Sequence, residues 1–516
     1  MTVVTLSKRR SGEDPGTPVV RLTGIRKSFQ GNEVVHGVDL ELQPGEVHAL
    51  VGENGAGKST LMKCLAGIHA PDQGTIEIDG VVRRFRSPRE AQEAGVAIVH
   101  QEFTLLPHRT VAENLFLGRE PGRFGRVDKA GMERRAGEVL ADLGVTSIRP
   151  SAVVSGLSVA QQQIVEIAKA LVLDARVLAM DEPTAALADA EVALLYDLVR
   201  RLTGRGLAVL YVSHRLPEVF DLSSRITVMK DGAHVATEPT GELTTDNVVR
   251  LMVGRPLNAL FPDLAAAEEL GKERIAVAGG GNARIHDIDL TIRAGEVVGL
   301  AGLQGSGRSA LARALCGVAP FTRGSYQVEG RPARIRSPRR AVRAGIAFVT
   351  EDRKGEGLAL RQTVQDNVLL VRRSVSGRRT RSTVADLLRE MTVVAASPAS
   401  EVRLLSGGNQ QKVVLAKWLA VGPTVLVVDE PTRGIDIGAK ATIYQLIRDL
   451  ARSGVAVLLI SSELPELIGM SDRLLVMHRG RIAGELPPQS SEEDVMRLAT
   501  GHGQPGENGQ SEEAES

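Results

Sequence analysis

The stretch Gly52-Glu53-Asn54-Gly55-Ala56-Gly57-Lys58-Ser59-Thr60 decides the fold. It follows an apolar run, residues 47–51, that is typical of a buried strand, and it precedes a helical pattern over residues 61–67. Its glycines let backbone N–H groups turn inward around a phosphate, and the following helix points its positive end there. At this spacing the lysine reaches nucleotide phosphates and the serine hydroxyl ligates Mg²⁺. All nine residues are therefore candidate nucleotide contacts.

Length and composition narrow the class of protein. A chain of 516 residues is too long for one core, and 43% hydrophobic with 24% charged residues is ordinary for a soluble globular protein. The formal net charge of +1 gives no general attraction to nucleic acid or anionic lipid. Two cysteines, Cys64 and Cys316, are too few for a disulfide framework, and we expect both side chains to be buried as small apolar residues. This use of cysteine fits a protein of the reducing cytoplasm.

The chain carries no sequence signal for crossing a membrane. No run approaches the roughly 18 apolar residues of a membrane span. Residues 1–18 are polar and lack the apolar core of a signal peptide. If the protein acts at a membrane, other subunits must supply the span.

The sequence repeats itself once. Gly45-Glu46-Val47 reappears 250 residues later (295 − 45) as Gly295-Glu296-Val297, and Asp181-Glu182-Pro183-Thr184 reappears as Asp429-Glu430-Pro431-Thr432. A period this long indicates two duplicated domains, and alternating strand and helix patterns predict an α/β fold for each. The predicted parts, in order, are a disordered tail (1–18), a first domain (19–254), a linker (255–271), a second domain (272–500) and a disordered acidic tail (501–516).

Three strand ends in the first half supply further candidate side chains. The apolar run at residues 177–180 ends in Asp181, a candidate Mg²⁺ ligand, and Glu182, a candidate to polarise the attacking water. Gln101 follows another strand and offers an amide that reaches Mg²⁺ or water. His214 ends a third strand, where an imidazole contacts a γ-phosphate. A single such residue is more often structural, so it is the ordered set that points to phosphoryl transfer.

Leu157-Ser158-Val159-Ala160-Gln161-Gln162-Gln163 opens a helix just before the acidic strand, and Leu405-Ser406-Gly407-Gly408-Asn409-Gln410-Gln411 occupies the same place in the second half. With the phosphate loop, the glutamine, the acidic strand and the histidine in this order, the first half resembles the nucleotide-binding domain of the ABC ATPases, and the second half contains a stretch close to that family's signature. The resemblance covers nearly the whole chain outside the tails. It implies two tandem P-loop NTPase domains of the ABC type, each with a helical subdomain.

The fused pair is similar to the ATP-binding subunit of bacterial monosaccharide importers, the ribose, galactose and xylose group. Residues 102–107 and 349–354 are like stretches typical of that group. The resemblance implies ATP and Mg²⁺, with Phe29 where the family usually stacks an aromatic ring on adenine. It also implies transmembrane permease subunits and a solute-binding protein as partners, no nucleic acid, a peripheral place on the cytoplasmic face of the membrane, and one copy per transporter. Residues 103–109 and 353–361 lie where the family contacts its permeases.

The second half departs from the family pattern in one direction. Arg308, Glu351 and Ser462 stand where the first half has Lys58, Gln101 and His214. The intact signature, by contrast, belongs to the second half, as does Asp436, whose first-half counterpart is Ala188. In the family each ATP lies between one domain's phosphate loop and the other domain's signature. In that arrangement the intact phosphate loop of the first half and the intact signature of the second half, with Ser406 and Gly408, belong to the same site. We therefore expect one hydrolytic site and one degenerate site.

Other functions remain open at this point. A nucleoside or autoinducer importer would use the same subunit, because the ATP-binding subunit does not touch the solute. A soluble twin ATPase acting on the ribosome would carry a long basic linker, and a DNA-repair ATPase would carry zinc-binding cysteine pairs or a coiled coil. A nucleotide-gated scaffold would hydrolyse almost no ATP. Arginines recur in matching clusters, which we expect to be solvated faces or partner contacts: Arg83, Arg84, Arg86, Arg89, Arg334, Arg336, Arg339 and Arg340.

Overall fold

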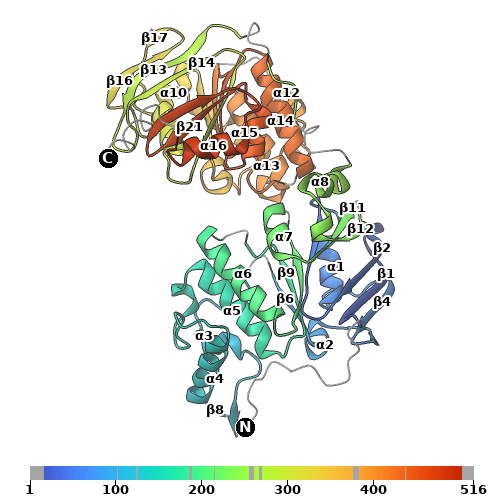
Figure 1. Cartoon of the computed structure of the whole chain (residues 1–516). Helices are drawn as coiled ribbons and strands as arrows, with labels where there is room; N and C mark the ends of the chain where they lie inside the picture. The colour runs from blue at the N-terminus through green and yellow to red at the C-terminus, as the bar shows by residue number, and fades with distance from the viewer. Residues whose placement is uncertain are drawn as a thin grey trace, which may run out of the picture. The chain divides into compact units, whose positions relative to one another are not determined.

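The chain divides into two compact units, Met1–Pro256 and Leu257–Ser516 (Figure 1). The structure is a computed structural model. It describes residues 17–100, 103–123, 126–184, 187, 189–213, 215–254, 261–265, 270–375, 383–435 and 437–502. Five residues considered above therefore lie outside the described part: Gln101, Glu102, Ala188, His214 and Asp436. Most of the predicted tails lie outside it as well, as do residues 255–260 and 266–269 of the predicted linker.

A mainly parallel sheet forms the centre of the first unit, as the sequence predicted. Its described strands are ordered β12-β11-β3-β10-β9-β6, and β12 alone among them pairs antiparallel. Their bounds are β3 (Val47–Gly52), β6 (Val96–Val99), β9 (Val177–Asp181), β10 (Ala208–Val212), β11 (Arg225–Lys230) and β12 (Ala233–Pro239). Strands β9 and β10 are almost entirely apolar because both faces of this sheet are covered.

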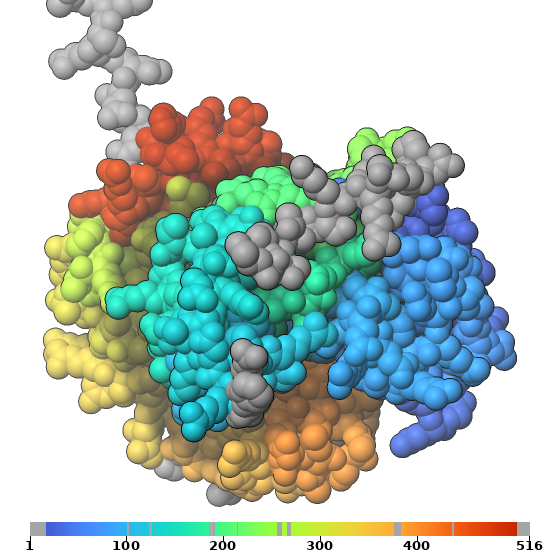
Figure 2. Space-filling view, turned by 90° about the horizontal axis from the view of Figure 1, so that it is seen from below, coloured from blue at the N-terminus to red at the C-terminus, as the bar shows by residue number. Residues whose placement is uncertain are grey.

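The two faces of the central sheet bury different partners. One face packs on α1 (Lys58–Leu65) and on an antiparallel sheet ordered β2-β1-β4-β5. The other face packs on the helices, with α4 and α5 contributing the apolar stripes. In Figure 2 the cyan surface around α3 and α4 forms a lobe separate from the blue surface of the antiparallel sheet. The bounds are β1 (Val20–Phe29), β2 (Asn32–Leu42), β4 (Gln73–Ile78), β5 (Val81–Arg83), α2 (Pro88–Glu93), α3 (Val111–Leu115), β7 (Gly122–Arg123), β8 (Arg126–Val127), α4 (Lys129–Asp142), α5 (Val159–Val172), α6 (Asp189–Thr203), α7 (Leu216–Leu222) and α8 (Thr245–Val253).

The second unit repeats this architecture. Its central sheet is ordered β18-β19-β20-β15-β21-β22, and its antiparallel sheet is ordered β14-β13-β16-β17. The strands are β13 (Glu273–Gly281), β14 (Ile288–Arg293), β15 (Val297–Gly302), β16 (Arg323–Val328), β17 (Arg331–Pro332), β18 (Ile346–Val349), β19 (Val425–Asp429), β20 (Ala456–Ile460), β21 (Arg473–His478) and β22 (Arg481–Leu486). The helices are α9 (Arg308–Leu315), α10 (Pro338–Ala344), α11 (Val364–Ser374), α12 (Val384–Glu390), α13 (Gly407–Leu419), α14 (Ile437–Arg452), α15 (Leu464–Met470) and α16 (Glu492–Ala499). Within the residues that the structure describes, no helix is long and apolar enough to cross a membrane.

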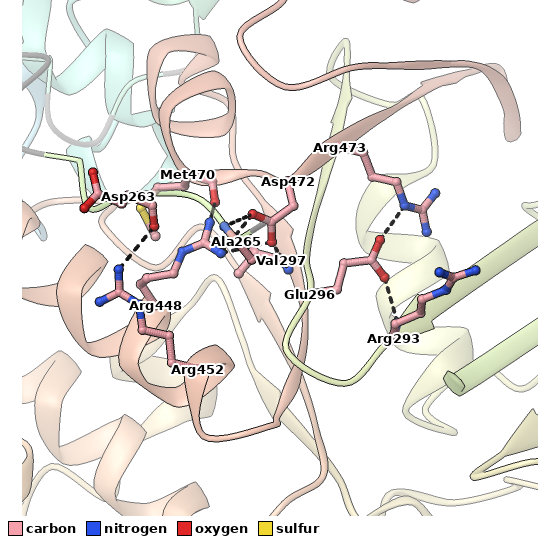
Figure 3. Close-up of polar contacts among 10 residues, drawn as sticks. All are labelled: Asp263, Ala265, Arg293, Glu296, Val297, Arg448, Arg452, Met470, Asp472 and Arg473. Carbon is pink, nitrogen blue, oxygen red and sulfur yellow. Dashed lines mark hydrogen bonds and ion pairs between the residues drawn. The ribbon is translucent and has the colours of Figure 1, made fainter. Parts of the chain in front are cut away.

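Residues 261–265 of the predicted linker pack against the second unit. The Phe261 ring stacks on Tyr444 of α14, with the ring centroids 5.2 Å apart. Ala265 donates its backbone N–H to Asp472 Oδ1 over 2.9 Å, and Arg452 donates to the Asp263 carbonyl over 3.4 Å (Figure 3). The second unit therefore takes in residues that the composition alone assigned to the linker.

A buried ion pair supports that segment. Arg448 donates to Asp472 Oδ2 over 2.9 Å and to the Met470 carbonyl over 2.6 Å, and its side chain is 1% exposed (Figure 3). Asp472 also accepts the backbone N–H of Val297 over 2.8 Å. Hydrogen bonds to a buried carboxylate offset part of the cost of removing its charge from water, and Ala265 supplies one of those that Asp472 accepts.

Candidate nucleotide site

The phosphate loop of the first unit joins β3 to α1, and two of its glycines are required by their surroundings. Gly52 has φ 157°, and a Cβ there would lie 2.2 Å from the Met229 carbonyl oxygen. Gly57 has φ 90°, and a Cβ would lie 2.7 Å from the Val34 carbonyl oxygen. A side chain at either position would push the loop away from strands β2 and β11. The loop can therefore keep this conformation against the two strands only because these residues are glycine.

Lys58 is held over the loop. Its Nζ donates to the carbonyl oxygens of Gly52 and Glu53 over 2.8 and 2.9 Å, and the residue is only 5% exposed. The ammonium group is thus held in a defined position against two carbonyl oxygens of the loop. Such preorganised charge stabilises the developing charge of a transferred phosphoryl group.

Ser59 and Asp181 meet at the head of α1 and the end of β9. Ser59 Oγ lies 3.5 Å from Asp181 Oδ1. Burial raises the pKa of Asp181, so its carboxylate is short of stabilising partners in the protein itself. A hydroxyl and a carboxylate oxygen are ligands that Mg²⁺ prefers, and a cation would relieve the buried charge. The residues present therefore fit Mg²⁺.

Glu182 adopts a backbone conformation that glutamate rarely takes. Its φ is 46°, in the left-handed region, and its backbone N–H donates to the Val212 carbonyl over 2.9 Å. Such a conformation costs about 1–3 kcal/mol and persists only where the surroundings impose it. It turns the chain sharply at the end of β9, directly beside Asp181, so the candidate base has a defined position.

Phe29 lies at the end of β1, 39% exposed. Its ring meets His69 edge to face with centroids 5.1 Å apart, and Lys27 Nζ lies 5.6 Å from its centroid. The hairpin that carries it continues into β2, where the carbonyl of Val34 borders Gly57. An exposed ring on the hairpin beside the phosphate loop is available for stacking on a base.

Two predicted groups, Gln101 and His214, lie outside the described residues, but their neighbours are defined. After Gln101, Thr104 donates its backbone N–H to Glu166 of α5 over 2.5 Å. Buried Asn114 accepts from the Leu106 backbone N–H over 2.7 Å. Asn367 makes the same bond to Ala359 in the second unit, over 2.8 Å. Both loops predicted to contact permeases are thus fixed to the helices behind them.

In the counterpart site of the second unit, the three substituted side chains bond to groups of their own unit. Arg308 donates to the Ser461 carbonyl over 2.5 Å, instead of to the loop carbonyls as Lys58 does. Glu351 pairs with Arg433. Ser462 donates to Glu430 Oε2 over 3.1 Å, and burial raises the pKa of Glu430. Glu430 keeps the left-handed backbone, with φ 51°, so the fold is conserved while the polar groups are redirected.

The two signature helices differ at their first turns. Ser158 caps α5 by accepting from the Gln161 backbone N–H, and Ser406 caps α13 by accepting from the Asn409 N–H. The next two residues are Val159-Ala160 in α5 and Gly407-Gly408 in α13. Gly408 is buried, and a Cβ there would lie 3.2 Å from the Cβ of Ala439, so the first turn of α13 has little room for the side chains that α5 carries. This difference supports the prediction that the second unit carries the intact signature.

Sequence reasoning missed Glu218, a 4% exposed residue of α7 that contacts the ends of both β9 and β10. The available signal was its recurrence as Glu466 at the spacing of the Asp-Glu-Pro-Thr repeat. Glu166 was also missed, and it has no acidic counterpart, because Val414 occupies the matching position.

Comparisons with known proteins agree with this architecture. The family model for the ABC transporter matches residues 35–185 and again residues 285–433. The chain is 50% identical over 491 residues to the ribose import ATP-binding protein RbsA 3 of Rubrobacter xylanophilus, covering 94% of this chain and 99% of that protein. It is 48% identical over 495 residues to the ribose import ATP-binding protein RbsA 2 of Streptomyces avermitilis, covering 94% and 97%. A solved ATP-binding cassette of an ABC transporter is 26% identical, covers 46% of this chain and 98% of its own, and has a TM-score of 0.42.

The chain belongs to the ABC transporter family, whose model matches it twice, once in each unit. The expected fold, two tandem ABC-type P-loop domains, is confirmed. The similarity to the ribose import ATP-binding proteins extends over nearly the whole length of both chains.

Proposed function

We propose that this protein hydrolyses ATP to power the import of a simple sugar through a membrane transporter. One observation carries the proposal: two ABC segments occur in one chain that matches ribose import ATP-binding proteins over 94% of its length. The first unit adds a phosphate loop with an oriented lysine and an acidic strand end beside it. Ribose is the first solute to test, and a nucleoside or autoinducer is the alternative.

We further propose that the two units share one hydrolytic site. The first unit contributes the phosphate loop, Asp181 and Glu182, and Gln101 and His214 complete that side. The second unit contributes Ser406 and Gly408, with Asp436 nearby. The redirected side chains of the second unit support this proposal, because Arg308, Glu351 and Ser462 each have a partner within their own unit. The second site then holds nucleotide weakly or hydrolyses it slowly.

Each group has a defined task in this proposal. Lys58 and the backbone N–H groups of the loop neutralise charge on the phosphates. Ser59, Asp181 and Gln101 would hold Mg²⁺, which screens the phosphate oxygens when it is bound. Glu182 accepts a proton from the attacking water or orients it, a role typically worth about 10²–10⁴-fold in rate. His214 contacts the γ-phosphate, and Phe29 stacks on adenine.

Transmembrane permease subunits and a solute-binding protein are the proposed partners, and no nucleic acid is among them. Residues 103–109 and 353–361 are the proposed contacts with the permease. Their backbones are tied to Asn114 and Asn367, so a displacement of either loop would be passed to the helices of its unit. The protein would then lie at the cytoplasmic face of the membrane, with one copy in each transporter.

Uptake by the assembled transporter tests this function. Membrane vesicles carrying the chain with its permease, loaded with ATP, should accumulate labelled ribose, and Glu182→Gln should abolish the uptake. Competition by excess nucleoside but not by sugars would assign the alternative solute. Sedimentation with ribosomes, together with no dependence of uptake on the chain, would overturn the proposal in favour of the soluble twin ATPase.

A further inference from the structure

Glu218 is a buried carboxylate that accepts hydrogen bonds from four side chains. It accepts from Thr184 Oγ1, 2.7 Å from each of its oxygens, and from Arg215 Nη1 over 2.7 Å. Tyr211 and Ser213 donate to its Oε2 over 3.0 and 3.2 Å. Four side chains from two loops and a strand thus converge on one buried carboxylate. Removing such an acceptor would leave buried donors unpaired.

The partners of Glu218 lie on both sides of the proposed hydrolytic groups. Thr184 is two residues after Glu182, in the turn whose left-handed backbone must be imposed from outside. Ser213 and Arg215 flank position 214, and Ser213 Oγ also accepts the Arg215 backbone N–H over 3.0 Å. Glu218 therefore links the turn of the candidate base to the loop of the candidate histidine.

We propose that Glu218 is a positioning residue, which fixes the Glu182 turn against Ser213 and Arg215 so that Glu182 reaches the γ-phosphate from one defined position. The proposal rests on the hydrolytic role proposed for Glu182. A backbone bond, Glu182 N–H to the Val212 carbonyl, already joins the two strand ends at one point. The Thr184–Glu218–Ser213 bridge supplies a second point and prevents rotation about the first. An error of about 1 Å in such placement costs on the order of 10²-fold in rate.

The second unit contains the same bridge in a weaker form. Thr432 lies 3.0 Å from both oxygens of Glu466, and Ser461 donates to Glu466 over 2.5 Å. Leu459 and Glu463 stand in place of Tyr211 and Arg215, and Glu463 pairs with Lys440 instead. The unit with the degenerate site has therefore lost the phenol and the cation while keeping the two hydroxyls. Because the second unit keeps the fold without them, we assign the Tyr211 and Arg215 donors to the hydrolytic site of the first unit and not to the stability of the fold.

Steady-state ATP hydrolysis by the full chain tests the proposal, with Glu466→Gln as the matched control. Glu218→Gln keeps the shape but replaces one acceptor oxygen by a donor, so we expect kcat to fall by about 10- to 100-fold. We expect the KM for ATP to change by less than about threefold, because the phosphate loop is untouched. Glu466→Gln should leave kcat within about twofold of the unmodified chain.

Threonine 184 offers a second test that does not depend on the stability of Glu218→Gln. Thr184→Ser keeps the hydroxyl and should retain hydrolysis, whereas the near-isosteric Thr184→Val should lose it. The double variant Thr184→Val with Glu218→Gln should lose little more than either alone, because both break one bridge. Additive losses, an unchanged kcat in Glu218→Gln, or an equal loss in Glu466→Gln would each overturn the inference. Absence of hydrolysis by the unmodified chain would instead refute the proposed function and the inference together.

Discussion

Ser462 donates its hydroxyl to Glu430 Oε2 over 3.1 Å, at the position where the first unit has a histidine. The carboxylate that repeats Glu182 is therefore engaged within its own unit. Burial also raises the pKa of Glu430, which by itself makes the carboxylate a stronger base, so it is the hydrogen bond from Ser462 that sets this site apart. The contact gives a physical reason why the proposed degenerate site, although it keeps the acidic pair Asp429-Glu430, would hydrolyse ATP slowly.

The first prediction follows from this pair of sites. Glu182→Gln should lower kcat by about 10²–10⁴-fold, because it removes the group that accepts a proton from water. Glu430→Gln should leave most of the turnover, since Ser462 already occupies that carboxylate. Phosphate release by the two purified variants at saturating ATP measures the difference. Equal losses in both would contradict the single hydrolytic site.

A second prediction concerns replacing the lysine of the first phosphate loop by arginine and the arginine of the second loop by lysine. Lys58→Arg should lower kcat/KM by about 10²-fold, because the planar guanidinium does not fit the buried position over the Gly52 and Glu53 carbonyls. Arg308→Lys should change kcat/KM by less than about threefold, because Arg308 contacts the Ser461 carbonyl and no phosphate in the proposed active site. The measurement is ATPase rate against ATP concentration. A gain of activity in Arg308→Lys as large as the loss in Lys58→Arg would show that the second site is only mildly impaired.

The sequence was sufficient to predict features formed by residues close together in the chain, but not contacts between residues that only the pairing of strands brings together. The phosphate loop was recognisable because strand, glycines and helix follow one another in about twenty residues. The duplication then located the second domain and the direction of its changes. The recurrence of Glu218 as Glu466 marks the residue in the sequence, but not its bond to Thr184, because the two residues are far apart in sequence and meet only where β9 and β10 are adjacent.

The junction shows the same limit. Composition marked residues 255–271 as a linker, yet Phe261 stacks on Tyr444 and Ala265 is bonded to Asp472. The receiving surface is specific to the second unit. Asp221 and Ser224 occupy the positions of Gly469 and Asp472 in the first unit. Such a surface is visible only when the repeat is compared in three dimensions.

The effect of Gly469→Ala on the stability of the second unit should change sign according to whether Phe261 is present. A Cβ on Gly469 would lie 2.5 Å from two carbons of the Phe261 ring, so Gly469→Ala should destabilise the second unit by about 1–3 kcal/mol. In a Phe261→Ala background the clash is gone. There the same change should stabilise α15 by about 0.5–1 kcal/mol, because alanine favours helix over glycine.

Unfolding by denaturant measures both effects. Trp418, the single tryptophan of the chain, lies in α13 and reports on the second unit through its fluorescence. Opposite signs of the Gly469→Ala effect in the two backgrounds would establish the contact of Phe261 with α15. The same destabilisation in both would place the clash elsewhere.

The raised pKa of Glu466 leads to a prediction of how the stability of the second unit depends on pH. Burial raises its pKa from 4.5 to about 7, with Glu463 adding to the shift while Ser461 and Lys440 oppose it. Between these values the folded unit holds a proton that the unfolded chain has released. The contribution of the protonated Glu466 to the stability of the folded unit is therefore fully present below about pH 4.5 and is lost as the pH rises through about 7.

The size of that loss follows from the shift. A change of 2.5 pH units in the pKa corresponds to about 3 kcal/mol in the free energy of unfolding. Glu466→Gln cannot ionise, so its stability should lack this fall, and the two curves should diverge between pH 5 and pH 8. Denaturant unfolding followed by Trp418 fluorescence at several pH values measures the divergence. Parallel curves for the two proteins would mean that Glu466 is ionised in the folded unit throughout this range, held by the hydroxyls of Thr432 and Ser461.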